Sequence, residues 1–220
     1  MTEELINECK KLLEDNLVSI IKFGTEGQPN NILIILKKID IQDLDKIKPT
    51  ILKHSKKTKV VPILFTEAGL QDGVDVFPLE FLDIKYPHEV LIGEDIINKI
   101  KFDKNHVRRQ LEFELRSKLI HLRENYIWIK KSNELRSLLK SAIPTLMPLF
   151  YGMLFLKDIK PPSQLESLYK LVNENYNVDT SLFREIRLTK IKDDSLSGYI
   201  DKLMRLLQIL INQVDKMTFK

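Results

Sequence analysis

The chain has 220 residues, of which 43% are hydrophobic and 30% are charged, with seven glycines and nine prolines. This composition is typical of a soluble globular protein and excludes collagen-like, low-complexity and wholly disordered chains. The single cysteine, Cys9, excludes an internal disulfide framework and a cysteine-rich zinc site. Because the first residues are acidic and amphipathic, unlike a secretory signal, we expect a cytoplasmic protein.

The charged residues are distributed unevenly. Thirty-five basic and 31 acidic residues give a net charge of +4, which is too small to indicate nucleic acid as a partner. All eight arginines lie after residue 107, whereas the first hundred residues use only lysine as a basic residue. Arginine suits paired and interface positions better than lysine does. This change predicts a domain boundary near residue 100, with domains over residues 1–100 and 101–220.

The first hundred residues alternate between helical and strand patterns. Short apolar runs bounded by glycine, proline and asparagine predict strands, and residues 32–36, apolar on both faces, are typical of a central strand. Thr66 should cap a short helix that Gly73 ends. We expect helices over residues 3–16, 49–54 and 67–72, strands over 18–23, 32–36, 60–65 and 90–92, and a strand or extended segment over 77–86.

The second half has a helical pattern and no strand signal. The apolar run over residues 142–156 is shorter than the ~20 residues that cross a membrane, so we expect a buried bundle helix and no membrane partner. Pro144 and Pro148 should kink that helix or split it, and Ser163 with Glu166 should form a capping box. We expect amphipathic helices over residues 104–130, 133–155, 163–174 and 195–217, and a further one that starts at residue 179 or 180. Asp103 should cap the first of them. Together these helices should form an all-α bundle.

A strand ending in Phe23-Gly24-Thr25, a polar loop and a second strand resemble the start of the nucleotidyltransferase fold. In that family a Gly-Ser or Gly-Thr pair precedes an Asp-x-Asp motif that opens the next strand. The helical second half is similar to the bundles attached to minimal and antibiotic-modifying members. The resemblance implies an α+β fold, in which a small mixed sheet flanked by helices is followed by an all-α helical bundle.

The catalytic motif of that family is degenerate in this sequence. Asn31 and Leu33 occupy the two acidic positions, and a neutral amide and an aliphatic side chain cannot anchor the Mg²⁺ ions that nucleotidyl transfer needs. We therefore predict no metal site, no cofactor and no transferase activity. The chain is expected to act as a regulatory module that binds a nucleotide, another anion or a partner protein.

Two groups of residues are candidates for that binding. Gly24, Thr25, Gly27 and Asn31 are predicted to present backbone amides and polar side chains to an anion, although a tight turn between strands also needs glycine. Three arginines at seven-residue spacing are predicted to form one ridge that faces an anion or a partner, lining a cleft between the domains. The alternative for them is a solvated helix face with i,i+4 ion pairs. These arginines are Arg109, Arg116 and Arg123.

Three alternatives stay open. An active Mg²⁺-dependent nucleotidyltransferase would need displaced carboxylates, for which Glu26, Asp75 and Asp83 are candidates. Arg116 and His121 match the Arg-x4-His spacing of HEPN-type ribonucleases, but on a regular helix they lie ~140° apart. The apolar stripes of the bundle also suggest a homodimer.

Overall fold

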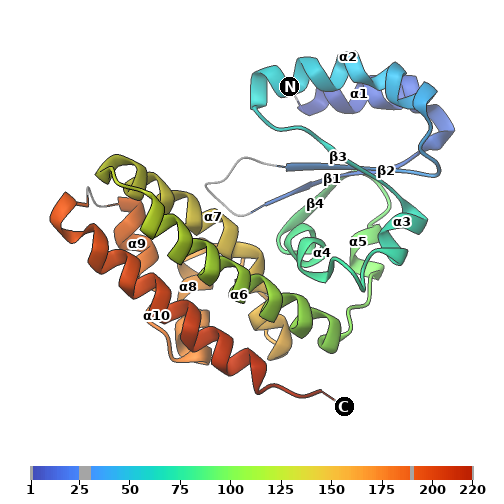
Figure 1. Cartoon of the computed structure of the whole chain (residues 1–220). Coiled ribbons are helices and arrows are strands. Elements are labelled where there is room, and N and C mark those ends of the chain that lie inside the picture. Colours follow the sequence, from blue (N-terminus) through green and yellow to red (C-terminus); the bar gives the residue numbers. More distant parts are fainter. Residues whose placement is uncertain (1, 25–30, 189–190, 220) are drawn as a thin grey trace. The chain divides into compact units, whose positions relative to one another are not determined.

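We describe a computed structural model of the chain that covers residues 2–24, 31–188 and 191–219. The chain divides into two compact units, Met1–Phe102 and Asp103–Lys220. The first unit contains a sheet with helices, and the second is helical (Figure 1). Each unit is described separately below.

The first unit is built on a four-stranded mixed sheet in the order β3-β2-β1-β4. β1 runs antiparallel to β2 and to β4, whereas β2 and β3 run parallel. The small mixed sheet predicted from the sequence is therefore confirmed. Its strands are β1 (Leu17–Phe23), β2 (Asn31–Leu36), β3 (Ile63–Thr66) and β4 (His88–Gly93).

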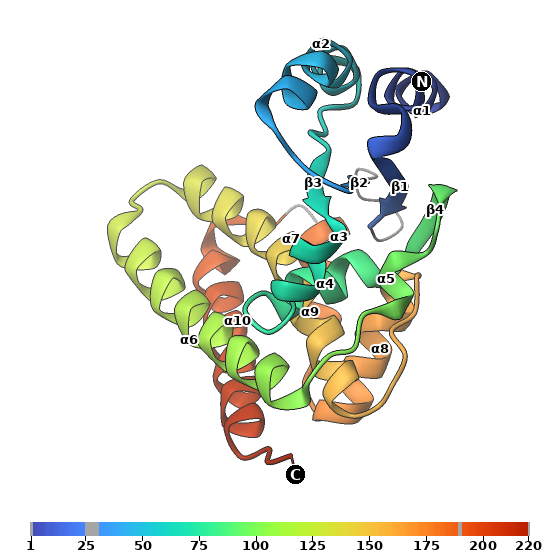
Figure 2. The same ribbon diagram turned by 90° about the vertical axis from the view of Figure 1, so that its right-hand side faces the viewer.

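Helices cover both faces of this sheet (Figures 1 and 2). Alternate residues of a strand point to opposite faces, so Ile32 and Ile34 of β2 pack on one side, while Leu33 and Ile35 pack on the other. This explains why the strand is apolar throughout its length. The first face is covered by α1 (Thr2–Leu13) and α2 (Ile41–Thr58), and the second by α3 (Glu67–Asp72), α4 (Pro78–Lys85) and α5 (Ile96–Lys99).

Two predictions for this unit are wrong. The helix expected to start at Pro49 begins at Ile41, where Asp40 accepts a hydrogen bond from the Asp43 N–H, and Pro49 lies inside it. The strand or extended segment expected over residues 77–86 is helix α4. Because α4 is buried on most of its surface, its apolar residues do not show a helical period. Pro78 lies in the first turn of the helix, where a backbone N–H would have no partner within the helix.

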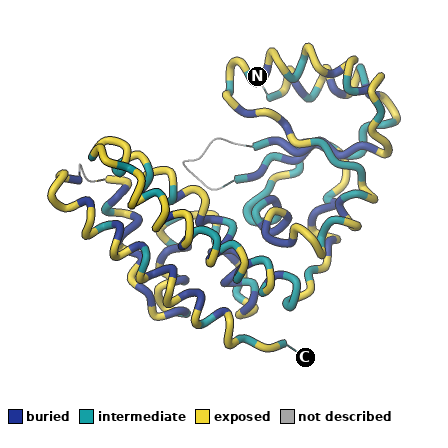
Figure 3. Tube along the Cα trace, in the orientation of Figure 1, coloured by how far each residue is buried: buried dark blue, intermediate teal, exposed yellow. Residues whose placement is uncertain are grey.

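The second unit is the expected all-α bundle. Its helices alternate buried and exposed positions along their length, as amphipathic helices around one core do (Figure 3). Phe150, Tyr169 and Phe183 pack in the core, with ring centroids 5.3–6.2 Å apart. The helices are α6 (Lys104–Trp128), α7 (Ser132–Leu156), α8 (Leu165–Tyr176), α9 (Ser181–Leu188) and α10 (Leu196–Asp215).

Local details of this bundle differ from the predictions. α7 is one helix that continues through Pro144 and Pro148, so it is not split. α8 begins after Gln164, which makes no side-chain cap, so the capping box predicted at Ser163 is wrong. Among the described residues, α7 is the one helix long and apolar enough to cross a membrane by length and composition, and 56% of its apolar window is buried inside the protein. That burial is typical of a core helix.

Candidate functional site

The end of the β1–β2 hairpin is the position at which the sequence predicts a ligand. Gly24 follows β1 with φ of +120°, a conformation that side chains disfavour, and its N–H donates to the carbonyl oxygen of Pro87 at 3.2 Å. Asn31 begins β2 and pairs with Phe23 in the antiparallel register. Three other residues predicted for this loop lie outside the described residues, namely Thr25, Glu26 and Gly27.

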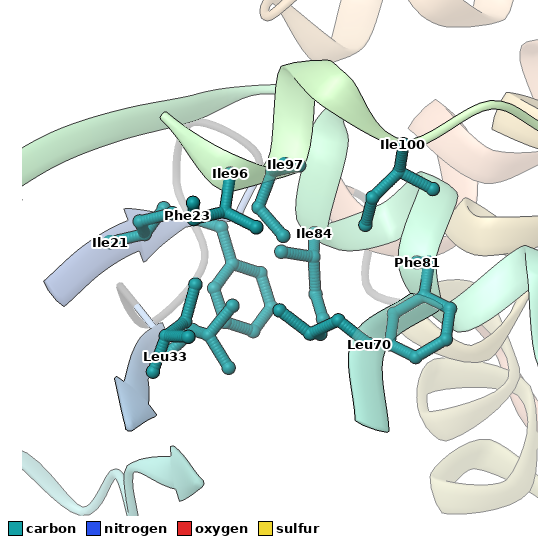
Figure 4. Close-up of a cluster of buried hydrophobic side chains, with 10 residues drawn as sticks. Ile21, Phe23, Leu33, Leu70, Phe81, Ile84, Ile96, Ile97 and Ile100 are labelled. Carbon is teal, nitrogen blue, oxygen red and sulfur yellow. The ribbon is translucent and has the colours of Figure 1, made fainter. Parts of the chain in front are cut away.

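Leu33, which the resemblance predicts at the second acidic position of the motif, lies inside the hydrophobic core. Leu33 shares a strand face with Asn31, two residues away, and its side chain is 0% exposed. Figure 4 shows it among Phe23, Leu70 and Ile84, in a cluster whose members are all apolar. A carboxylate at this position would lose its hydration without gaining a polar partner, which costs several kcal/mol or forces it to be neutral. This face of β2 therefore serves packing.

Asp75 and Asp83, the two fallback carboxylates that the structure describes, do not belong to a metal-holding cluster. Asp75 is exposed in the turn before α4, and Asp83 lies on α4 itself, so it does not extend from a strand as a third acidic residue of the family would. Burial, with a smaller contribution from repulsion by Glu80, raises the pKa of Asp83 to about 6. Throughout residues 2–24, 31–188 and 191–219, no group of three or more His, Cys, Asp or Glu side chains is arranged to hold a metal ion. The residues present at Asn31 and Leu33 do not fit Mg²⁺.

Sequence reasoning missed a histidine–carboxylate pair close to the hairpin. His88, which is 9% exposed in its side chain, pairs with Phe23 in the β1–β4 register and follows Pro87. Its Nδ1 lies 2.8 Å from the carbonyl oxygen of Lys85, and its Nε2 lies 3.0 Å from Oδ1 of Asp95. Both ring nitrogens of His88 thus lie within hydrogen-bond distance of an oxygen, one of the main chain and one of a carboxylate.

Asp95 connects this pair to the start of α5. Its Oδ1 also accepts from the Asn98 N–H at 3.1 Å, which caps the helix. Burial alone would raise the pKa of Asp95, but the hydrogen bonds from Asn98 and His88 outweigh it and hold that pKa below its ordinary value. Since both nitrogens of His88 are engaged, the pair links β4 to the start of α5. The helix-cap pattern at Asp95 was the one sequence signal for it.

The three predicted arginines lie on one exposed face of α6. Arg116 donates to Glu112 at 2.9 Å and lies 3.6 Å from Asp215. No ion pair joins Arg109 or Arg123 to another residue in the described part of the chain. The ridge is therefore present, and its position relative to the Gly24 hairpin stays a prediction.

The histidine of the ribonuclease alternative does not join Arg116. α6 continues past His121 to Trp128, so the two residues keep the angular separation of a regular helix. His121 is exposed and its Nδ1 lies 3.0 Å from Glu124. The structure does not bring Arg116 and His121 together.

Each unit also contains a cavity away from the Gly24 hairpin. One, of about 240 Å³, lies between α1 and α2, where the buried Nδ1 of His54 has no hydrogen-bond partner among the described residues. Burial lowers the pKa of His54. Another, of about 220 Å³, lies among α6, α7 and α10, and its lining combines leucines with polar residues that include His121 and Lys118. Neither contains a residue that the sequence predicts to bind a ligand.

Comparison with known proteins supports the fold and leaves the activity open. No protein-family model matches the chain, and no curated protein matches it. Among solved structures, it is similar to the spectinomycin adenyltransferase AAD(9) from Enterococcus faecialis, solved with ATP and spectinomycin. The TM-score is 0.52 at 11% sequence identity, covering 94% of this chain and 98% of that one. The chain thus has a nucleotidyltransferase-like α+β fold with a helical second unit.

Proposed function

We propose that this protein is a catalytically degenerate nucleotidyltransferase-like module that binds a nucleotide or another anion without a metal ion. The observation that carries the proposal is Leu33, which is 0% exposed in an apolar core at the position of the second metal-binding acid. Among the described residues, no cluster of carboxylates is arranged to anchor the ions that bridge a triphosphate and a nucleophile.

Binding is proposed at the Gly24 hairpin. Gly24 carries no side chain, so the end of β1 is open to a ligand, and Asn31 supplies an amide at the start of β2. The side-chain amide of Asn31 would donate a hydrogen bond to a phosphate oxygen, whereas the Gly24 N–H is already donated to Pro87. Thr25 and Gly27, which the sequence also predicts for this loop, lie outside the described residues. The structural neighbour was solved with ATP, which makes ATP the first ligand to try. Because Asn31 and Leu33 do not fit Mg²⁺, the proposed binding involves no magnesium ion.

Calorimetric titration with ATP tests the proposal. We expect binding whose affinity changes by less than about twofold between excess EDTA and Mg²⁺, and no transfer of radiolabel from nucleoside triphosphates. Asn31→Ala should weaken ATP binding about tenfold, whereas Gln71→Ala, at an exposed position of α3, should leave it unchanged. Titration with inorganic pyrophosphate separates a nucleotide site from a general anion site. No binding of either ligand would refute the proposal.

The active-transferase alternative predicts the opposite pattern. It requires Mg²⁺-dependent label transfer that is lost in Asp83→Asn or Asp75→Asn and kept in Asp72→Asn, an exposed carboxylate on α3 that serves as the control. Such a result would show that displaced carboxylates support catalysis. It would overturn the degenerate module.

A further inference from the structure

α6 carries a second stripe of residues on the face opposite its buried one. Arg109, Phe113, Arg116, Ile120, Arg123 and Ile127 follow one another at intervals of four, three, four, three and four residues. At 3.6 residues per turn, all six lie within about 40° of one line along the helix. We call these six residues the α6 seam.

The apolar members of the seam are unusually exposed. Phe113, Ile120 and Ile127 are 68%, 52% and 81% exposed. Single exposed apolar residues are common on protein surfaces, but three in one line are typical of an interface. Their spacing is that of the a positions of a coiled coil, with an arginine at every d position between them. α6 therefore presents one half of a coiled-coil interface.

The charge of the seam restricts what can cover it. Arg109 and Arg123 have no ion-pair partner in the segments that the structure describes. Arg116 forms ion pairs with Glu112 and Asp215, and Glu112 also pairs with Arg108. A helix that covers Phe113, Ile120 and Ile127 also removes water from these guanidinium groups. Burying an unpaired cation is costly, so the covering helix must supply carboxylates in the arginine layers.

A second copy of α6 does not supply them. In a parallel pair, each d position faces the same d position, so arginine would face arginine in every such layer. In an antiparallel pair, each arginine would face an apolar residue. The seam itself contains no acidic residue. Self-association through this face would therefore bury unpaired cations in either orientation.

We propose that the α6 seam binds an amphipathic helix of a partner protein that carries acidic residues in the layers facing Arg109, Arg116 and Arg123. The apolar layers of that helix cover Phe113, Ile120 and Ile127. The seam spans 18 residue steps, which correspond to ~27 Å of helix. The proposal rests on α6 alone and does not depend on the proposed function.

Synthetic peptides and the full chain test this proposal. Two fluorescein-labelled helical peptides of about 25 residues carry isoleucine in the layers that face the apolar residues of the seam and glutamate in the layers that face its arginines. One peptide is designed to bind parallel to α6 and the other antiparallel to it. Matched peptides carry lysine in place of glutamate. By fluorescence anisotropy, we expect one glutamate peptide to bind about tenfold tighter than its lysine counterpart, with an advantage that falls as salt is added.

Charge reversal of the seam provides the decisive comparison. The triple variant Arg109→Glu, Arg116→Glu and Arg123→Glu should prefer the lysine peptide. The control triple Arg184→Glu, Arg187→Glu and Arg205→Glu changes the net charge equally on exposed residues of α9 and α10 and should keep the original preference. Far-ultraviolet circular dichroism of both variants checks that the helices remain folded.

Three results would overturn the proposal. The first is equal binding of the glutamate and lysine peptides to the wild-type chain. The second is sedimentation of the chain at twice 25.8 kDa that Ile120→Glu abolishes, because the seam would then pair with itself. The third is tight binding of a labelled oligouridylate that the seam triple variant loses while neither peptide binds, which would make the partner a nucleic acid.

Discussion

Tyr176 donates its phenolic hydroxyl to the main-chain carbonyl oxygen of Met153 at 2.5 Å and thereby joins α8 to α7. Both residues are buried, and burial raises the pKa of Tyr176 above its ordinary value. Gln213 of α10 donates to the carbonyl oxygen of Tyr176 at 2.6 Å. Tyr176 thus joins three helices of the second unit, through its side chain to α7 and through its main-chain carbonyl to α10.

We predict that Tyr176→Phe lowers the free energy of unfolding by about 1 kcal/mol, since it removes a buried hydrogen bond while keeping the ring. Urea unfolding followed by circular dichroism measures this change. Tyr126→Phe, at a residue 39% exposed on α6, is the control and should be neutral. Equal effects of the two variants would contradict a specific role for the hydroxyl.

Leu33→Ala should lower the free energy of unfolding by about 2–5 kcal/mol, the range for removing a leucine from a tightly packed core. The side chain is 0% exposed and lies in the cluster of Figure 4. Leu52→Ala, at a site 51% exposed on α2, should cost far less. If the two variants were equally stable, the region around Leu33 would not be a packed core.

Introducing an acidic pair at positions 31 and 33 should not create a metal site. The double variant Asn31→Asp with Leu33→Asp recreates the family motif in sequence, but the second carboxylate would enter an apolar cluster. We expect a strong loss of stability and no increase in melting temperature when Mg²⁺ is added. Differential scanning fluorimetry with and without MgCl₂ measures both. Stabilisation by Mg²⁺ would show that the cluster can rearrange into an ion site.

The pKa of Asp83, raised to about 6, predicts that the protein loses stability as the pH rises from about 4 to 6. In that range the folded state binds more protons than the unfolded state, so deprotonation favours unfolding. Asp83→Asn should remove this slope and stabilise the protein at pH 7 by about 1–2 kcal/mol. Urea titrations at several pH values test it, and an unchanged slope in the variant would disprove it.

Asp95 predicts the opposite dependence. Because its pKa is held below the ordinary value, its carboxylate stabilises the fold at neutral pH, and this contribution is lost as the pH falls below about 4. Asp95→Asn should lower neutral stability by less than about 1 kcal/mol, since the side chain is 36% exposed and screened by water. The variant should also be less sensitive to acid than the wild type. The same titrations as for Asp83→Asn measure both effects.

Sequence patterns predicted the elements whose signals are local. The apolar runs of β1 and β2, the cap of α3 at Thr66 and the cap of α6 at Asp103 lie where they were expected. These features depend on a few neighbouring residues, so they are visible before any tertiary contact is known.

The failures concern elements that tertiary packing decides. α4 was expected to be extended because burial on most sides erases the helical period, although Pro78 was a start signal. The helix through Pro49 persists because Ile47 and His54 bury its inner face around the proline. The residues of the His88–Asp95 pair lie seven positions apart, one in β4 and the other in the turn after it. They belong to no common helix or strand, so neither pattern predicts that their side chains meet.

The burial of Leu33 also has an evolutionary consequence. The cluster around it joins residues from two strands and three helices, each shaped to its neighbours. A codon change that placed a carboxylate at position 33 would destabilise the fold unless the neighbouring side chains changed as well. Selection for a stable chain is therefore expected to keep this position apolar.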